Sequence, residues 1–297
     1  MLSELSAIIA PILICSSIGF IWVRTGTPYP SDFITRLVMN IGAPCLIVSS
    51  LGKIDVDRQV LGQVALAATF ILASLGFASV IITRYYRLRA AVFIPPMLFA
   101  NTGNMGLPLC FFAFGDVGLA IGLGVFLIST VAQMTVGMFI VSSGQGTITE
   151  RLVHLLKQPL LASALIATAM LLTDSQLPLW LDNTVGLLAG FTIPLMMITL
   201  GVSLANLNVI GWRRSVSFSL LRLLGGFSIA WLCCEILQIE GIARSALILQ
   251  SSMPVAVFNY LLAHKYHCDP QEVAGMVVIS TLLSFISLPF LLSYLLM

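Results

Sequence analysis

Charged residues are scarce in this sequence. Asp, Glu, Lys and Arg together make up only 9% of the 297 residues, whereas hydrophobic residues make up 59% and the mean hydropathy is +1.05. Soluble domains carry about 25% charged residues, so a water-soluble protein of this length would lack the polar side chains that its surface needs. The composition therefore excludes a soluble protein and predicts an integral membrane protein, with the lipid bilayer as its partner.

Several functional motifs are also missing. The net charge is only +2 and no basic tract occurs, so we expect no nucleic-acid partner. The six cysteines form no C-x-x-C pair, and we expect them to be small buried hydrophobic residues and not metal ligands. No G-x-x-x-x-G-K-[ST] loop is present, which argues against an ATP-driven pump. Neither a cofactor nor a metal site is expected.

Ten long apolar segments are present instead. About 20 apolar residues are needed for a helix to cross the hydrocarbon core, and none of these segments has the short alternation of a barrel strand. The sequence therefore predicts an all-α membrane protein with ten transmembrane helices. The predicted spans are Leu5–Val23, Phe33–Leu51, Val60–Ile82, Val92–Phe114, Val117–Val141, Leu155–Leu172, Val185–Leu204, Val216–Leu237, Ala243–His264 and Val273–Leu296.

The loop charges predict an orientation. Cytoplasmic loops of membrane proteins are enriched in Lys and Arg. Here the odd-numbered loops hold ten such residues, against three in the even loops and both tails. This bias places the odd loops in the cytoplasm and both termini on the opposite side of the cell (inner or plasma) membrane. The ten are Arg24, Arg36, Arg84, Arg87, Arg89, Arg151, Lys157, Arg213, Arg214 and Lys265, and the three are Lys53, Arg58 and Arg244.

An internal repeat divides the chain. Prolines within the predicted spans recur at a nearly constant separation of 148, 150 and 146 residues, and two local stretches also match. We therefore expect two five-helix units, residues 1–148 and 149–297. Because five is odd, the second unit enters the membrane from the opposite side, which is typical of alternating-access transporters. The proline pairs are Pro11 with Pro159, Pro44 with Pro194, and Pro108 with Pro254; Ala43–Gly52 matches Ile193–Gly201, and Leu127–Val131 matches Val278–Leu282.

The fourth and ninth predicted spans carry polar residues, glycines and prolines near their centres. Proline removes a backbone donor and glycine weakens a helix, so we expect both helices to unwind at mid-membrane. A half-helix that begins near Pro108 or Pro254 would bind an anion at its positive end, and the carbonyl ends before the breaks could hold a cation. A structural kink with hydrogen bonds between helices is the alternative. The candidate substrate-binding residues are Asn101, Thr102, Gly103, Asn104, Pro108, Gln250, Ser251, Ser252 and Pro254.

Three further polar residues lie within spans. Gln133 and Asn259 are candidate cavity residues, although either could simply bond between helices. Arg222 lies about 9 Å deep, six residues from the cytoplasmic edge. It could extend to the interface or form a structural pair, or it could be the counter-charge of a bound anion.

At these residues the chain resembles the auxin efflux carrier family, which includes the plant PIN proteins and shorter bacterial organic-acid carriers. The resemblance covers essentially the whole chain. It rests on Asn101–Pro108, Gln250–Asn259, Ile193–Gly201 and Val278–Pro289. Related bile-acid/sodium symporters share the general architecture.

The resemblance implies that spans four and nine cross at their prolines, with substrate beside Asn101, Pro108 and Pro254. It implies an elevator-like movement of a transport bundle (spans 3–5 and 8–10) against a scaffold (spans 1, 2, 6 and 7), and a homodimer formed through the scaffold. The central loop, about Ser142 to His154, is shorter than the regulatory loop of many plant members. Auxin is therefore not expected as the natural substrate.

Together these features predict a secondary transporter for a small organic anion, such as a carboxylate. The spans contain no well-buried Asp or Glu, which disfavours proton coupling through a membrane carboxylate and an intramembrane enzyme. Voltage-driven movement of the anion fits the sequence. A sodium-coupled symporter of the bile-acid type, with sodium bound by neutral oxygens, is the alternative.

Overall fold

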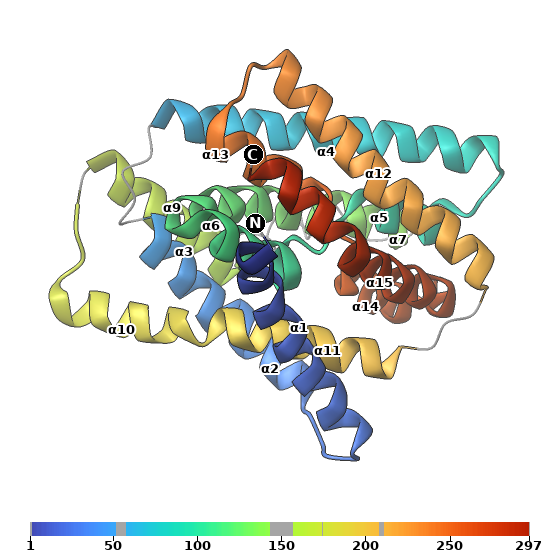
Figure 1. Ribbon diagram of the computed structural model, residues 1–297, viewed down its shortest axis with the longest axis horizontal. Helices are drawn as coiled ribbons and strands as arrows, with labels where there is room; N and C mark the ends of the chain where they lie inside the picture. The colour runs from blue at the N-terminus through green and yellow to red at the C-terminus, as the bar shows by residue number, and fades with distance from the viewer. Residues whose placement is uncertain (1, 52–57, 143–156, 174, 208–210, 297) are drawn as a thin grey trace.

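The computed structural model describes residues 2–51, 58–142, 157–173, 175–207 and 211–296, which fold into helices (Figure 1). No strand occurs among these residues apart from one isolated β-bridge. The helices are α1 Leu2–Arg24, α2 Ser31–Leu37, η1 Val38–Gly42, α3 Ala43–Leu51, α4 Arg58–Tyr85, α5 Ala90–Leu98, η2 Thr102–Gly106, α6 Leu107–Ala132, η3 Gln133–Gly137, α7 Met138–Val141, α9 Pro159–Thr173, α10 Leu179–Gly190, α11 Thr192–Asn206, α12 Trp212–Ile236, α13 Gly241–Ser251, α14 Val257–Lys265 and α15 Pro270–Leu295.

Seven helical stretches in the described part of the chain are long and apolar enough to cross a membrane by themselves. The all-helical membrane class predicted from the sequence is therefore confirmed. The number is lower than the ten predicted spans for three reasons: the sixth span is short, the ninth is divided in two, and the fourth and fifth share one helical stretch. The helix α9 has 15 residues, α13 and α14 are short helices of 11 and 9 residues, and one stretch of 40 residues contains parts of two predicted spans.

That 40-residue stretch, Thr102–Val141, is not one straight rod. At about 1.5 Å per residue it would measure about 60 Å, twice the hydrocarbon thickness. Gly115 interrupts it with a left-handed backbone conformation (φ 63°, ψ −155°), which a residue with a Cβ rarely adopts. The chain therefore turns at Gly115, between the predicted spans Val92–Phe114 and Val117–Val141.

The helices associate in two groups. The helix α1 packs on α11, while α3 packs on α9 and α10. In the other group α4 contacts α5, α6 and α12, and α12 contacts α13 and α15. In Figure 1, α4 runs across the upper part of the view and α10 and α11 run across the lower part, with α5 and α6 between them.

Glycines bring α1 and α11 into direct backbone contact. A Cβ at Gly19 would lie 2.0 Å from the Ile198 carbonyl oxygen, and one at Gly201 would lie 1.8 Å from that of Ser16. Small residues allow such close approach, because lipid offers helices little hydrophobic driving force to associate. The hydroxyl of Ser16 also donates to the Met197 carbonyl at 3.3 Å.

Some sequence predictions fall outside the described residues. The boundary between the two expected five-helix units and nearly all of the central loop lie within residues 143–156. The first two residues of the predicted span Leu155–Leu172 lie there as well.

Candidate functional site

The first interruption lies between α5 and η2. The helix α5 ends at Leu98, Phe99 is extended (φ −99°, ψ 111°), and helix resumes at Thr102. Pro95 and Pro96 lie in the last turns of α5. Neither residue has the N–H that helical hydrogen bonding requires, so α5 is weakened just before it ends.

Pro108 does not cause this interruption. It lies six residues after helix resumes, at the point where the wider π-turn η2 passes into α6. In η2 the Gly106 amide donates to the Asn101 carbonyl at 3.1 Å. The expectation that the half-helix begins near Pro108 is therefore wrong: helix resumes at Thr102, six residues earlier, with Asn101 as its N-cap residue.

The second interruption contains Pro254. The helix α13 ends at Ser251 and α14 begins at Val257. At the end of α13 the Ser252 hydroxyl donates to the Ile248 carbonyl at 2.7 Å, which satisfies one acceptor of the last turn. Here the interruption lies where the sequence predicts it.

The two interruptions lie against each other and exchange backbone hydrogen bonds. The Asn101 amide donates to the Pro254 carbonyl at 2.7 Å, and the Ala256 amide donates to the Phe99 carbonyl at 3.1 Å. Together they form the isolated antiparallel β-bridge. Non-helical backbone at membrane depth needs partners of this kind, because lipid supplies none.

Gln133 and Asn259 bond between helices. The Gln133 amide Nε2 donates to Asn259 Oδ1 at 2.9 Å, and Asn259 Nδ2 donates to the Phe99 carbonyl at 3.0 Å. Both side chains are buried. They therefore connect η3 and α14 to the first interruption, as the structural alternative for these two residues predicts.

Gln250 fills a space between two glycines. A Cβ at Gly106 would lie 2.2 Å from Gln250 Oε1, and one at Gly122 would lie 2.9 Å from its Nε2. Nε2 donates to the Gly122 carbonyl at 3.3 Å, whereas the buried Oε1 has no hydrogen-bond partner among the described residues. The glycines therefore hold the side chain of α13 against α6 and leave one acceptor open.

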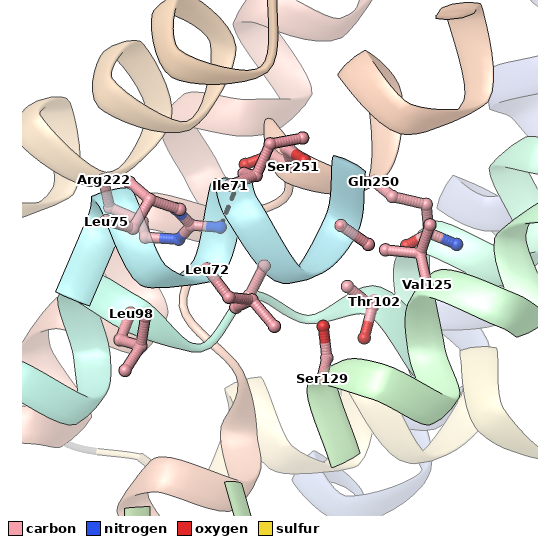
Figure 2. Close-up of a pocket in the computed structure, with 12 residues that line it drawn as sticks. Ile71, Leu72, Leu75, Leu98, Thr102, Val125, Ser129, Arg222, Gln250 and Ser251 are labelled. Carbon is pink, nitrogen blue, oxygen red and sulfur yellow. Dashed lines mark hydrogen bonds between the residues drawn. The ribbon is translucent and has the colours of Figure 1, made fainter. Parts of the chain in front are cut away.

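Arg222 on α12 lies in the interior of the protein, with 2% of its surface exposed. Its Nη2 donates to the Ser251 carbonyl, the last of α13, at 2.9 Å (Figure 2). Its Nε and Nη1 have no hydrogen-bond partner in the described part of the chain. The expectation that it extends to the interface is therefore wrong, because its length is used to reach the end of α13.

A small cavity lies between α4 and the two interruptions. About 20 Å³ of it can hold the centre of a water molecule, which suffices for one water but not for an organic anion. Figure 2 shows Arg222 and Ser251 on one side of it and Gln250, Thr102 and Ser129 on the other. Its lining residues are Ala68, Ile71, Leu72, Leu75, Leu98, Ala100, Thr102, Val125, Ser129, Arg222, Gln250 and Ser251.

The predicted site residues thus gather in one region but play different parts. Thr102, Gln250 and Ser251 line the cavity, whereas Asn101 is buried beside it with an unpaired Nδ2. Pro254 lies in the bridge between the interruptions. The remaining predicted residues lie in η2 and the first turn of α6 (Gly103, Asn104 and Pro108) or just after α13 (Ser252).

Two residues of this region were not among the candidates. Ser129 lines the cavity, and the hydroxyl of Ser280 accepts a hydrogen bond from the Val255 amide at 3.0 Å. Both lie in the matching stretches Leu127–Val131 and Val278–Leu282. The polar positions of that repeat were the signal that could have identified them.

Comparison with known proteins gives a consistent result. The model of the family described as membrane transport protein matches residues 4–292. An uncharacterized transporter of Methanothermobacter thermautotrophicus is 28% identical over 94% of this chain and 94% of its own length. Another, from Methanocaldococcus jannaschii, is 24% identical over 86% of this chain and 87% of its own length. This chain therefore belongs to the membrane transport protein family of auxin efflux carriers and PIN-like proteins, and it is a transporter and not an enzyme.

Proposed function

We propose that this transporter is a secondary carrier for a small organic anion, in particular a carboxylate. The site is the meeting point of the two interrupted helices, and the carrier works by elevator-type alternating access. The observation that carries the proposal is the pair of hydrogen bonds that joins Asn101 to Pro254 and Phe99 to Ala256. Two helix interruptions that satisfy each other at membrane depth are typical of transporter binding sites.

The choice of an anion rests on local charge and donors. The positive end of the η2–α6 helix points to Asn101, whose buried Nδ2 is an unused donor. Arg222 is the only charged side chain among the buried residues that the structure describes. With a cation and open donors here, a carboxylate is the ligand class that the chemistry favours.

Reciprocal packing supports the proposal of ten crossings in two inverted repeats. The first span, α1, packs on α11 of the seventh, and the second, through α3, packs on α9, the sixth. Likewise α4 contacts α6 in the first unit, and α12 contacts α15 in the second. A pseudo-two-fold relation between two five-helix units requires such exchanged pairs.

The proposed elevator movement has a candidate sliding surface. The scaffold would comprise α1, α2, α3, α9, α10 and α11, and the transport bundle would comprise α4–α7 and α12–α15. Contacts between the groups include those of η2 with α11 and of α6 with α1 and α3. The first interruption thus lies next to the scaffold, where a substrate would pass from one side of the membrane to the other. The proposed homodimer would form through the scaffold, in the cell inner or plasma membrane with both termini outside.

The test is transport by purified protein in liposomes. A panel of mono- and dicarboxylates is loaded on one side without ATP, and a potassium diffusion potential of either sign is applied. We expect carboxylate flux that follows the potential and is absent from protein-free liposomes. Flux of cations or neutral solutes but of no carboxylate, or a strict need for ATP, would reject the proposal.

A further inference from the structure

We propose that Arg222 is a built-in cation that occupies the carbonyl end of α13, where a coupling sodium ion would otherwise bind, so that this carrier works without sodium. The inference rests on the proposed function insofar as it concerns transport. Its structural part, the replacement of a bound cation by a guanidinium, stands on geometry alone.

The guanidinium lies at the end of a half-helix. Nη2 bonds the Ser251 carbonyl at 2.9 Å, and α13 ends at that residue (Figure 2). The C-terminal end of a helix carries a partial negative charge of roughly half a unit. A positive partner therefore stabilises a membrane helix that ends in the interior, and Arg222 supplies it for α13.

The contact is made close by a glycine one turn further along α12. A Cβ at Gly226 would lie 2.0 Å from the Ser251 carbonyl oxygen and 3.0 Å from Arg222 Nη1. No larger residue would let α13 end here against the backbone of α12. Gly226 and Arg222 thus form one built receptor for the end of α13.

The surrounding groups are those of a cation site. The cavity beside Arg222 is lined by the hydroxyl-bearing residues Thr102 and Ser129 and by Gln250 and Ser251. The Gln250 Oε1 acceptor has no hydrogen-bond partner among the described residues. Carbonyl, amide and hydroxyl oxygens are the ligands that hard cations take in proteins.

The guanidinium makes that site unsuitable for a second cation. It is always protonated and cannot leave. For two unit charges about 5 Å apart at an effective dielectric constant of about 20, repulsion lowers the affinity for the second monovalent cation by roughly 100-fold or more. Removing the charge while keeping a polar side chain, as in Arg222→Gln, should therefore turn the cavity into a sodium site.

The experiment compares thermal unfolding midpoints in sodium chloride and in choline chloride at equal ionic strength. The proteins are the wild type, Arg222→Gln, Arg222→Lys and the control Arg214→Gln, which changes an exposed arginine of the same helix. We expect equal midpoints in both salts for the wild type, the Lys variant and the control. The unfolding midpoint of the Gln variant should be about 2 °C or more higher in sodium chloride, because an ion that binds only the folded state stabilises it.

Carboxylate uptake is then measured in the same two salts. Wild-type and Arg222→Lys uptake should not depend on sodium. Uptake by Arg222→Gln should fall in both salts, because the charge that favours the anion is lost, so the unfolding midpoint is the measurement that tests this variant. A sodium response of the wild type in either measurement, or an equal midpoint of Arg222→Gln in both salts, would overturn the proposal. If the Gln variant is recovered in neither salt, the wild type and the Lys variant decide: sodium independence in both supports the proposal, and a response in either rejects it.

The two readouts separate this inference from the proposed function. The unfolding midpoint needs neither substrate nor transport. A sodium-stabilised Arg222→Gln variant in a protein that moves no carboxylate would leave the cation replacement standing and reject only the anion carrier.

Discussion

The two helix interruptions solve the same problem by different means. The second ends a helix against a charged side chain, because the last carbonyl of α13 accepts from Arg222. The first has no charged partner among the described residues. It relies on amides, since the Phe99 carbonyl accepts from Asn259 and from the Ala256 backbone. The second interruption is therefore fixed electrostatically, whereas the first leaves a buried donor, Asn101 Nδ2, without a hydrogen-bond partner among the described residues. In the proposed function this donor binds the anion.

The largest effect is expected at the second interruption, where Arg222 binds the end of α13. In Gly226→Ala the new methyl group would overlap the Ser251 carbonyl, so α13 must move away and the Arg222 hydrogen bond lengthens. Overpacking costs about 1–3 kcal/mol of the free energy of unfolding and occasionally more, and a Cβ that lies 2.0 Å from a backbone oxygen is at the upper end or above. The matched control is Gly225→Ala, whose Cβ meets nothing within 4 Å. Equal thermal midpoints for the two variants would show that the second interruption does not depend on this contact.

Asn101→Ala tests the ligand donor of the first interruption. Loss of a hydrogen bond to a charged group costs about 1.5–3 kcal/mol, which corresponds to a roughly 10- to 100-fold decrease in kcat/KM for carboxylate transport. The change should leave the yield of folded protein near that of the wild type, because Nδ2 bonds no other described residue. Unchanged transport kinetics would remove Asn101 from the site.

The amide connection of the first interruption should make a smaller contribution. We expect Gln133→Leu and Asn259→Ala each to destabilise the protein, with a coupling energy of about 1 kcal/mol in a double-mutant cycle for their 2.9 Å hydrogen bond. Denaturation of the two single variants and the double variant measures this coupling. Strict additivity would mean that the hydrogen bond does not stabilise the crossing.

The smallest effect is expected for Pro108→Ala. Because Pro108 lies within a helical run that begins at Thr102 and not at the interruption, the substitution should leave turnover close to that of the wild type. Pro254→Ala provides the comparison, since Pro254 lies within the second interruption and the substitution adds a backbone N–H that would favour helix there. A loss of transport in Pro108→Ala as large as in Pro254→Ala would restore Pro108 to a role at the break.

Much of this arrangement could be predicted from local sequence. The apolar runs identify a helical membrane protein, and the polar residues with Pro254 identify the second interruption, because the cost of such residues in lipid is a local property. The position of the first interruption was not predicted correctly, because the break was assigned to Pro108 and not to Pro95 and Pro96, which weaken the end of α5. Pro95 and Pro96 remove backbone donors in the last turns of α5, whereas Pro108 follows a π-turn in a helical run that continues through it.

The partners of the polar residues could not be predicted. Arg222 and Ser251 are 29 residues apart, and Gln133 and Asn259 are 126 apart. Hydropathy places each residue at a depth in the membrane but does not say which helices are neighbours. For that reason Arg222 remained compatible with an interfacial side chain, a structural pair or a counter-charge until the end of α13 was located beside it.

The backbone contact between α1 and α11 limits how this protein can deform. Where Gly19 and Gly201 allow main chain to touch main chain, no side-chain rotamer can change to absorb a shift of one helix along the other. Strain applied there would have to bend the helices themselves. Any give must therefore come from surfaces built from longer side chains, such as the contact of Phe126 with Gly103. The pair α1 and α11 thus behaves as one rigid body relative to which other helices can be displaced.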